Sequence, residues 1–148
     1  MTLKNIKRIK FNKDLCAGCA SCEMACSAAH FGKASRYLSA IRLDADFYNH
    51  IFEIHVCKQC KSASCMDACP KHAIKVDETT GAKYVDQELC VKCGLCVKAC
   101  PFADEAFPLI KRELLNDEKK IIKCDLCRGR EKGPACVEIC YYGALQVE

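Results

Sequence analysis

The sequence lacks several features that mark common classes of protein. It contains no tryptophan, and no apolar run reaches the 18 residues expected of a membrane-spanning helix. The N-terminal segment MTLKNIKRIKF has neither an apolar signal-peptide core nor a twin-arginine pair, so we expect a cytoplasmic location. No Walker loop, G-x-G-x-x-G motif or serine–histidine–aspartate arrangement is present. The chain is therefore not expected to be an enzyme.

Hydrocarbon side chains are scarce as well. Hydrophobic residues make up 51% of the 148 residues, but this fraction includes 16 cysteines. Without the cysteines the apolar core is small for the chain length, and a small core needs cross-links or metal centres for stability. We therefore expect inorganic centres to form much of the core.

The cysteines form four groups of similar spacing. The third group is the C-x2-C-x2-C-x3-C-P run of bacterial ferredoxins, which binds [4Fe-4S] clusters. The first has this spacing without the proline, the second has two extra residues, and the fourth has a turn-rich eight-residue loop. The four groups are Cys16, Cys19, Cys22 and Cys26; Cys57, Cys60, Cys65 and Cys69; Cys90, Cys93, Cys96 and Cys100; and Cys124, Cys127, Cys136 and Cys140.

Two other uses of cysteine fit this pattern less well. Disulfides need an oxidising compartment, for which the N-terminal sequence provides no signal. A structural zinc site uses four ligands in two well-separated pairs, whereas here three or four cysteines crowd into each short segment. Four [4Fe-4S] clusters are therefore the predicted cofactors, with all sixteen cysteines as ligands.

The segments between the cysteines predict an α+β fold of short helices and β-hairpins. We expect a basic strand within residues 1–15, a short helix carrying Cys26, and strands over 37–43 and 51–56. Two further hairpins are expected, one turning near Gly81 and one turning at Asn116 and Asp117. Tyr141 and Tyr142 are expected to be packing residues.

An internal repeat indicates two ferredoxin-like modules. SCMDACPKHAIKV (64–76) and ACVEICYYGALQV (135–147) match at their cysteines and at several apolar positions, so the fourth group is also half of a ferredoxin. A short hairpin linker joins the second and third groups, which predicts an inner module at 57–107 and an outer, split module at 1–56 and 108–148. The alternative is a tandem order, first with second and third with fourth.

The nested order, the four groups and the long last loop resemble four-cluster electron-transfer subunits of the dimethyl sulfoxide reductase type. The segments CAGCASCEMACSAAHFGKASRYLSAIRL and VCKQCKSASCMDACPKHAI are most similar to the small iron–sulfur subunits of tungsten aldehyde oxidoreductases. Some members of the family replace a cysteine of the third group with tryptophan and hold a [3Fe-4S] cluster, but here Cys93 is present. The resemblance also implies cross-ligation, in which the fourth cysteine of each group completes the cluster of its partner group. The implied ligand sets are Cys16, Cys19, Cys22 and Cys140; Cys26, Cys124, Cys127 and Cys136; Cys57, Cys60, Cys65 and Cys100; and Cys69, Cys90, Cys93 and Cys96.

The function implied by this resemblance is a non-catalytic subunit that conducts electrons between a tungsten or molybdenum pterin enzyme and an acceptor or further subunit. The alternatives are a free polyferredoxin, or a ferredoxin associated with carbon monoxide dehydrogenase or hydrogenase. The formal net charge of +4 favours the subunit, because free carriers are usually strongly acidic. No aromatic and basic stripe suggests a nucleic-acid partner.

Overall fold

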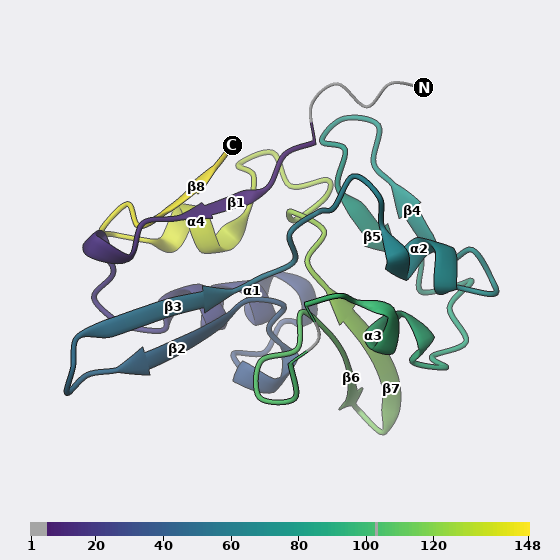
Figure 1. Ribbon diagram of the computed structural model, residues 1–148, viewed down its shortest axis with the longest axis horizontal. Helices are drawn as coiled ribbons and strands as arrows, with labels where there is room; N and C mark the ends of the chain where they lie inside the picture. The colour runs from purple at the N-terminus through teal and green to yellow at the C-terminus, as the bar shows by residue number, and fades with distance from the viewer. Residues whose placement is uncertain (1–5, 103) are drawn as a thin grey trace.

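The computed structural model describes residues 6–102 and 104–148 and contains short helices between small antiparallel sheets (Figure 1). This arrangement confirms the predicted α+β class. The strands are β1 (Ile9–Phe11), β2 (Arg42–Asp46), β3 (Ile51–His55), β4 (Ile74–Val76), β5 (Lys83–Val85), β6 (Ile110–Leu115), β7 (Glu118–Lys123) and β8 (Leu145–Val147). The helices are η1 (Lys13–Leu15), α1 (Ser21–Phe31), η2 (Arg36–Leu38), α2 (Ser64–Ala68), α3 (Leu95–Ala99) and α4 (Ala135–Ile139).

Three of the sheets are hairpins between consecutive strands. The β4–β5 hairpin turns through residues that include Gly81, and Asn116 and Asp117 connect β6 to β7. Both of these last two residues have positive φ angles (51° and 64°), as tight hairpin turns require and as asparagine and aspartate tolerate. These two predicted hairpins are confirmed.

The hairpin of β2 and β3 differs from the prediction. The predicted first strand, residues 37–43, is mostly η2 and a bend, and β2 begins only at Arg42. Asp44, which lies just beyond the predicted strand, is in β2 opposite Glu53. The apolar residues at 38, 40 and 41 misled the prediction, since they are buried in the core rather than aligned along a strand.

The fourth sheet joins the two ends of the chain. β1 pairs with β8 in an antiparallel register that sets Ile9 against Val147 and Phe11 against Leu145. Figure 1 shows these strands side by side, with α4 beneath them. The N-terminal and C-terminal parts of the chain therefore form one structural region.

The helices pack in two pairs, α1 with α4 and α2 with α3. The helix α1 is longer than the short helix predicted around Cys26, and it includes Ala28 and Ala29. It ends at Gly32, which has a positive φ angle of 69°. The other three α-helices have five residues each and end one residue before the fourth cysteine of their group. Proline follows that cysteine after α2 and α3, where it prevents the helix from continuing.

Two apolar clusters form the core, one for each helix pair. The first surrounds Cys26 and Cys136 and includes Leu38, Ile41 and Ile122. The second surrounds Cys96 and includes Ile74, Ile110 and Ile121. Both clusters contain cysteines. Within the described part of the chain, no helix is long and apolar enough to cross a membrane.

Candidate metal centres

The four cysteine loops share one backbone conformation. The residue two positions after the first cysteine has a positive φ angle in each loop: 72° at Gly18, 50° at Gln59, 56° at Lys92 and 56° at Leu126. Only one of these residues is glycine, although the left-handed region is unfavourable for other residues. The repeated conformation therefore indicates a common requirement at all four loops.

The requirement is visible in the hydrogen bonds that the cysteine sulfurs accept. The backbone N–H groups of Gly18, Gln59 and Lys92 donate to the first sulfur of their loops, with N···S distances of 3.4 Å. Other backbone N–H groups donate to Cys26 (3.4 Å, from Ala40), Cys69 (3.3 Å, from Ala73) and Cys127 (3.3 Å, from Ala135). Such donors stabilise thiolates and are a means of tuning iron–sulfur clusters. The residues present therefore fit cluster binding.

Gly18 also has a steric role in the first loop. A Cβ atom at this position would lie 2.7 Å from the Cε1 atoms of both Phe47 and Phe52. These rings contact each other edge to face, with centroids 5.5 Å apart, and hold the β2–β3 hairpin against the loop. Glycine is required here both for the positive φ angle and for close packing.

The structure brings cysteines of different groups together. Burial raises the pKa of Cys65, and the nearby thiolates of Cys57 and Cys100 raise it further. Burial likewise raises the pKa of Cys96 to about 11, with contributions from Cys90 and Cys69. Cys100 and Cys69 each lie beside the loop of the other group.

In the first and fourth groups, too, the fourth cysteine of each group lies beside the loop of the other group. Burial raises the pKa of Cys136, and the thiolates of Cys26 and Cys127 raise it further. Cys140 lines a small enclosed cavity together with Cys16, Cys19 and Cys22. All sixteen cysteines are free thiols, so none of these close approaches is a disulfide.

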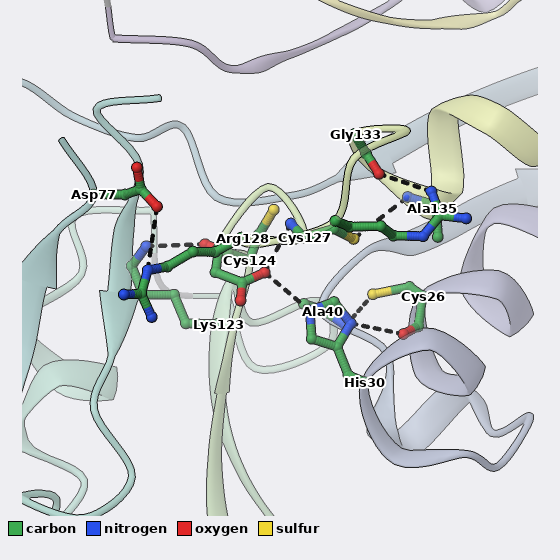
Figure 2. Close-up of polar contacts among 12 residues, drawn as sticks. Cys26, His30, Ala40, Asp77, Lys123, Cys124, Cys127, Arg128, Gly133 and Ala135 are labelled. Atoms are coloured by element: carbon green, nitrogen blue, oxygen red, sulfur yellow. Dashed lines mark hydrogen bonds and ion pairs between the residues drawn. The ribbon is translucent and has the colours of Figure 1, made fainter. Parts of the chain in front are cut away.

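A buried glutamine connects the second loop to the fourth. The side chain of Gln59 is 2% exposed. Its Nε2 donates to the carbonyl oxygen of Cys124 (2.8 Å), and its Oε1 accepts from the backbone N–H of Lys83 (2.8 Å). On the outside of this junction, Arg128 pairs with Asp77 at 3.2 Å (Figure 2). The same guanidinium stacks 3.9 Å from the ring centroid of Tyr84. These polar contacts hold the second and fourth cysteine loops together.

Two lysines are buried at the same junction. Lys83 is 2% exposed and Lys123 is 7% exposed. The Nζ of Lys123 donates to the carbonyl oxygen of Lys83 and to that of Cys124, and Figure 2 shows the second of these bonds. The Nζ of Lys83 has no hydrogen-bond partner among the residues that the structure describes. Burial and the charge of Lys123 lower the pKa of Lys83, while nearby thiolates act in the opposite direction.

A histidine and an aspartate lie beside the fourth loop. The Nε2 of His30 lies 2.9 Å from Oδ1 of Asp125, and its Nδ1 lies 2.8 Å from the carbonyl oxygen of Cys26 (Figure 2). The hydrogen bond to Asp125 raises the pKa of His30 to about 11. This pair joins α1 to the loop of Cys124 and Cys127.

The charged group beside the first loop is Glu23, which is completely buried. Its carboxylate accepts from the backbone N–H of Leu43 and from Nε of Arg36, both at 2.6 Å. The guanidinium of Arg42 lies 3.4 Å away. The glutamate therefore ties α1 to the segment that leads into β2.

The sequence analysis identified the cysteines but not the polar residues around them. Gln59, Lys83, Lys123 and Glu23 were missed, because each lies in a locally unremarkable run and is buried only by distant segments. The prediction for Tyr141 and Tyr142 was wrong: their exposed fractions are 92% and 51%. Only one signal was available, namely that Lys123 immediately precedes a ligand at the end of an apolar run.

Comparisons with known proteins identify two matching iron–sulfur families. The 4Fe-4S dicluster domain matches residues 48–148, and the 4Fe-4S binding domain matches residues 13–29. The aliphatic sulfonate oxidoreductase polyferredoxin-like subunit of Pyrococcus furiosus is 40% identical over 133 residues, covering 90% of this chain and 70% of the relative. The electron transport protein HydN of Escherichia coli is 34% identical over 147 residues, covering 88% of this chain and 81% of the relative.

A solved structure has a similar fold. The active site complex BamBC of benzoyl coenzyme A reductase, as isolated, matches with a TM-score of 0.55 and 26% identity, covering 97% of this chain and 76% of that one. The names of the relatives describe electron transport proteins and oxidoreductase subunits. They confirm the predicted electron-transfer role.

Proposed function

The chain belongs to the 4Fe-4S dicluster domain family, and we propose that it is a subunit that binds four [4Fe-4S] clusters and conducts electrons between a catalytic oxidoreductase subunit and an acceptor. The observation that carries the proposal is the repeated loop, in which a positive-φ residue directs a backbone N–H toward the first cysteine sulfur. Each cluster, when bound, accepts and returns one electron at a time. The protein supplies the ligands, the spacing and the surrounding charge.

The four ligand sets of the proposal are those implied by cross-ligation. The pairing of β1 with β8 and the packing of α1 against α4 support an outer module made from the two ends of the chain. The packing of α2 against α3 supports an inner module at 57–107. The cavity lined by Cys140 and the first loop supports the set that spans the greatest sequence distance.

Exposure of the cysteines suggests where electrons enter and leave. Of the sixteen, Cys19 and Cys93 are exposed, and they belong to the first and third groups. In the proposed sets these groups hold the two end sites, while the sites of Cys124 and Cys57 meet at the Gln59 junction. The path would run from one exposed loop through the junction to the other.

The partner proposed in most detail is a tungsten or molybdenum pterin enzyme in the cytoplasm. Its support is the resemblance of residues 16–43 to the small subunits of tungsten aldehyde oxidoreductases. The relatives named as oxidoreductase subunits support an enzyme complex of some kind. A free polyferredoxin, the second candidate, is supported by the relative named an electron transport protein. Metal analysis of the complex that co-purifies with the chain separates the two.

The test of cluster number is iron and sulfide analysis after anaerobic purification. Four complete cysteine sets predict about sixteen iron and sixteen sulfide per chain. Reduced protein is expected to give electron paramagnetic resonance (EPR) signals of magnetically coupled neighbouring clusters. Stoichiometric zinc without sulfide would overturn the proposal.

The test of the ligand sets is Cys140→Ser compared with Cys16→Ser and Cys90→Ser. In the nested order, Cys140→Ser and Cys16→Ser affect the same cluster, because loss of one thiolate converts that cluster to a three-iron form or changes its potential. In the tandem order, Cys140→Ser affects the same cluster as Cys90→Ser. A shared spectrum with Cys90→Ser would therefore overturn the nested arrangement.

A further inference from the structure

We propose that the ammonium groups of Lys83 and Lys123 raise the reduction potential of one site, that of Cys57, Cys60, Cys65 and Cys100, above the potentials of the other three. The inference rests on the proposed function, since it concerns a cluster held by that ligand set. It assigns to two lysines a role in setting the electron distribution within the chain.

The position of Lys83 is the first observation. It lies in β5, is fully buried, and its Nζ has no hydrogen-bond partner within residues 6–102 and 104–148. A buried ammonium without a partner is costly, so a positive group in this position requires a nearby negative charge. The thiolates of Cys57, Cys60 and Cys65 are close enough to favour its charged form.

Lys123 approaches the same site from β7. Two backbone carbonyl oxygens, of Lys83 and Cys124, fix its Nζ. Its charge acts on the thiolates of Cys65 and Cys100. The two lysines together therefore influence all four cysteines of one proposed set, and their own repulsion is offset only by a negative group between them.

Reduction of a cluster adds one negative charge, which a buried cation stabilises strongly because the surrounding dielectric constant is low. The potential of a [4Fe-4S] cluster depends on the net charge and solvent exposure of its site. The lysines stabilise the reduced form more than the oxidised form. The site is therefore easier to reduce.

Apart from Lys111, and from Lys123 itself, which also donates to the backbone of Cys124, the charges near the other sites are paired or exposed to solvent. Glu23, beside the first loop, has two arginine partners, and His30, beside the fourth loop, pairs with Asp125. Lys111, the remaining buried lysine among the described residues, lies near Glu113 and Glu23 as well as Cys26. The third loop has an exposed cysteine, Cys93, where water screens added charge.

This arrangement places the most easily reduced site at the junction between the two helix pairs. Electrons entering from either exposed loop would collect there, away from the surface. The lysines would thus favour retention of electrons in the interior until an acceptor is bound.

The experiment is an anaerobic redox titration of the complete chain, monitored by EPR, for Lys83→Met and Lys123→Met. Lys83→Met is expected to lower one of the four midpoint potentials and leave the other three unchanged, and Lys123→Met is expected to lower that same potential most, with a smaller change at the site of Cys124. Cys100→Ser should alter the same signal, which identifies the affected site. Lys75→Met is the matched control, because Lys75 is in the same hairpin but pairs with Asp86 at the surface (3.0 Å).

Two further variants keep the test decisive if a methionine variant loses iron. Lys83→Arg retains the charge and should retain the potential, whereas Lys83→Gln should lower it. Unchanged potentials, a shift of all four, or an equal shift in Lys75→Met would overturn the inference. These results are distinct from failure of the proposed function, which would appear as fewer than four clusters in the unmodified chain.

Discussion

The carboxylate of Glu23 and the ammonium of Lys83 are both completely buried beside predicted cluster ligands, but they differ in their hydrogen-bond partners. Glu23 accepts hydrogen bonds from Leu43 and Arg36 and has a second arginine nearby. Lys83 has no hydrogen-bond partner in the part of the chain that the structure describes. A buried charge with partners stabilises the fold by itself, whereas one without them depends on a bound group. We therefore assign Glu23 to the scaffold and propose that Lys83 belongs to the site.

The largest expected effect on stability follows removal of the buried carboxylate of Glu23. Glu23→Ala would leave Arg42 and the N–H of Leu43 without their partner, and we expect it to lower the free energy of unfolding by about 3 to 4 kcal/mol. Guanidinium-induced loss of cluster absorbance under anaerobic conditions measures the change. Glu53→Ala, at an exposed position in β3, is the control, with an expected change below about 0.5 kcal/mol. Equal effects of the two substitutions would contradict the role of Glu23.

A smaller effect is expected at the lysine junction. Gln59→Ala removes the side chain that bonds to Cys124 and Lys83, and it leaves a buried N–H and a buried carbonyl oxygen unpaired. The expected loss of unfolding free energy is about 2 to 3 kcal/mol, measured in the same way.

The control for this prediction is Gln87→Ala. Gln87 is exposed and makes one described side-chain hydrogen bond, to the carbonyl oxygen of Ile121 (3.0 Å). Its loss should cost about 0.5 to 1 kcal/mol. If Gln59→Ala costs no more than Gln87→Ala, then the junction does not stabilise the structure.

The smallest effect on stability is expected at Lys111 in β6. This lysine is buried like Lys83 but lies near Glu23, so it can be compared with both. Burial and Arg42 lower its pKa from 10.5 to about 8, although Glu113, Cys26 and Glu23 act in the opposite direction. The unfolded chain then binds more protons than the folded chain between pH 8 and pH 10.5, so stability rises with pH over this range.

The variant Lys111→Met should remove this rise and be more stable than the unmodified chain at pH 7, by about 1 kcal/mol. The midpoint of guanidinium unfolding at several pH values between 7 and 10 tests the prediction. Lys119→Met, at an exposed position, serves as the control. Parallel pH profiles for the unmodified chain and Lys111→Met would contradict it.

The parts of the fold that the sequence could predict are those encoded locally. The turn at Asn116 and Asp117 lies between two β-rich runs, and the cysteine spacing sets the length of each loop. The strand expected at 37–43 failed because its apolar residues pack against distant segments. The spacing and composition of apolar residues do not distinguish buried loop residues from the residues of a strand.

The polar environment of the sites could not be predicted for a related reason. Lys83 stands in the run Lys83–Val85, which resembles any partly exposed strand. It is buried because the loop of Gln59 and the end of β7 close over it from 24 and 40 residues away. A charge is placed next to a cluster by tertiary packing, which a spacing motif does not encode.

The pairing of β1 with β8 has a consequence for biosynthesis. A ribosome releases the loop of Cys16, Cys19 and Cys22 long before it adds residues 145–147, so β1 waits without its partner strand during most of translation. Residues 57–100 emerge earlier, and both α2 and α3 lie within them, although Ile110 and Ile121 of the later hairpin complete their apolar cluster. The ligands of the two proposed inner sets are therefore all synthesised by Cys100, whereas the set of the N-terminal loop is complete only with Cys140.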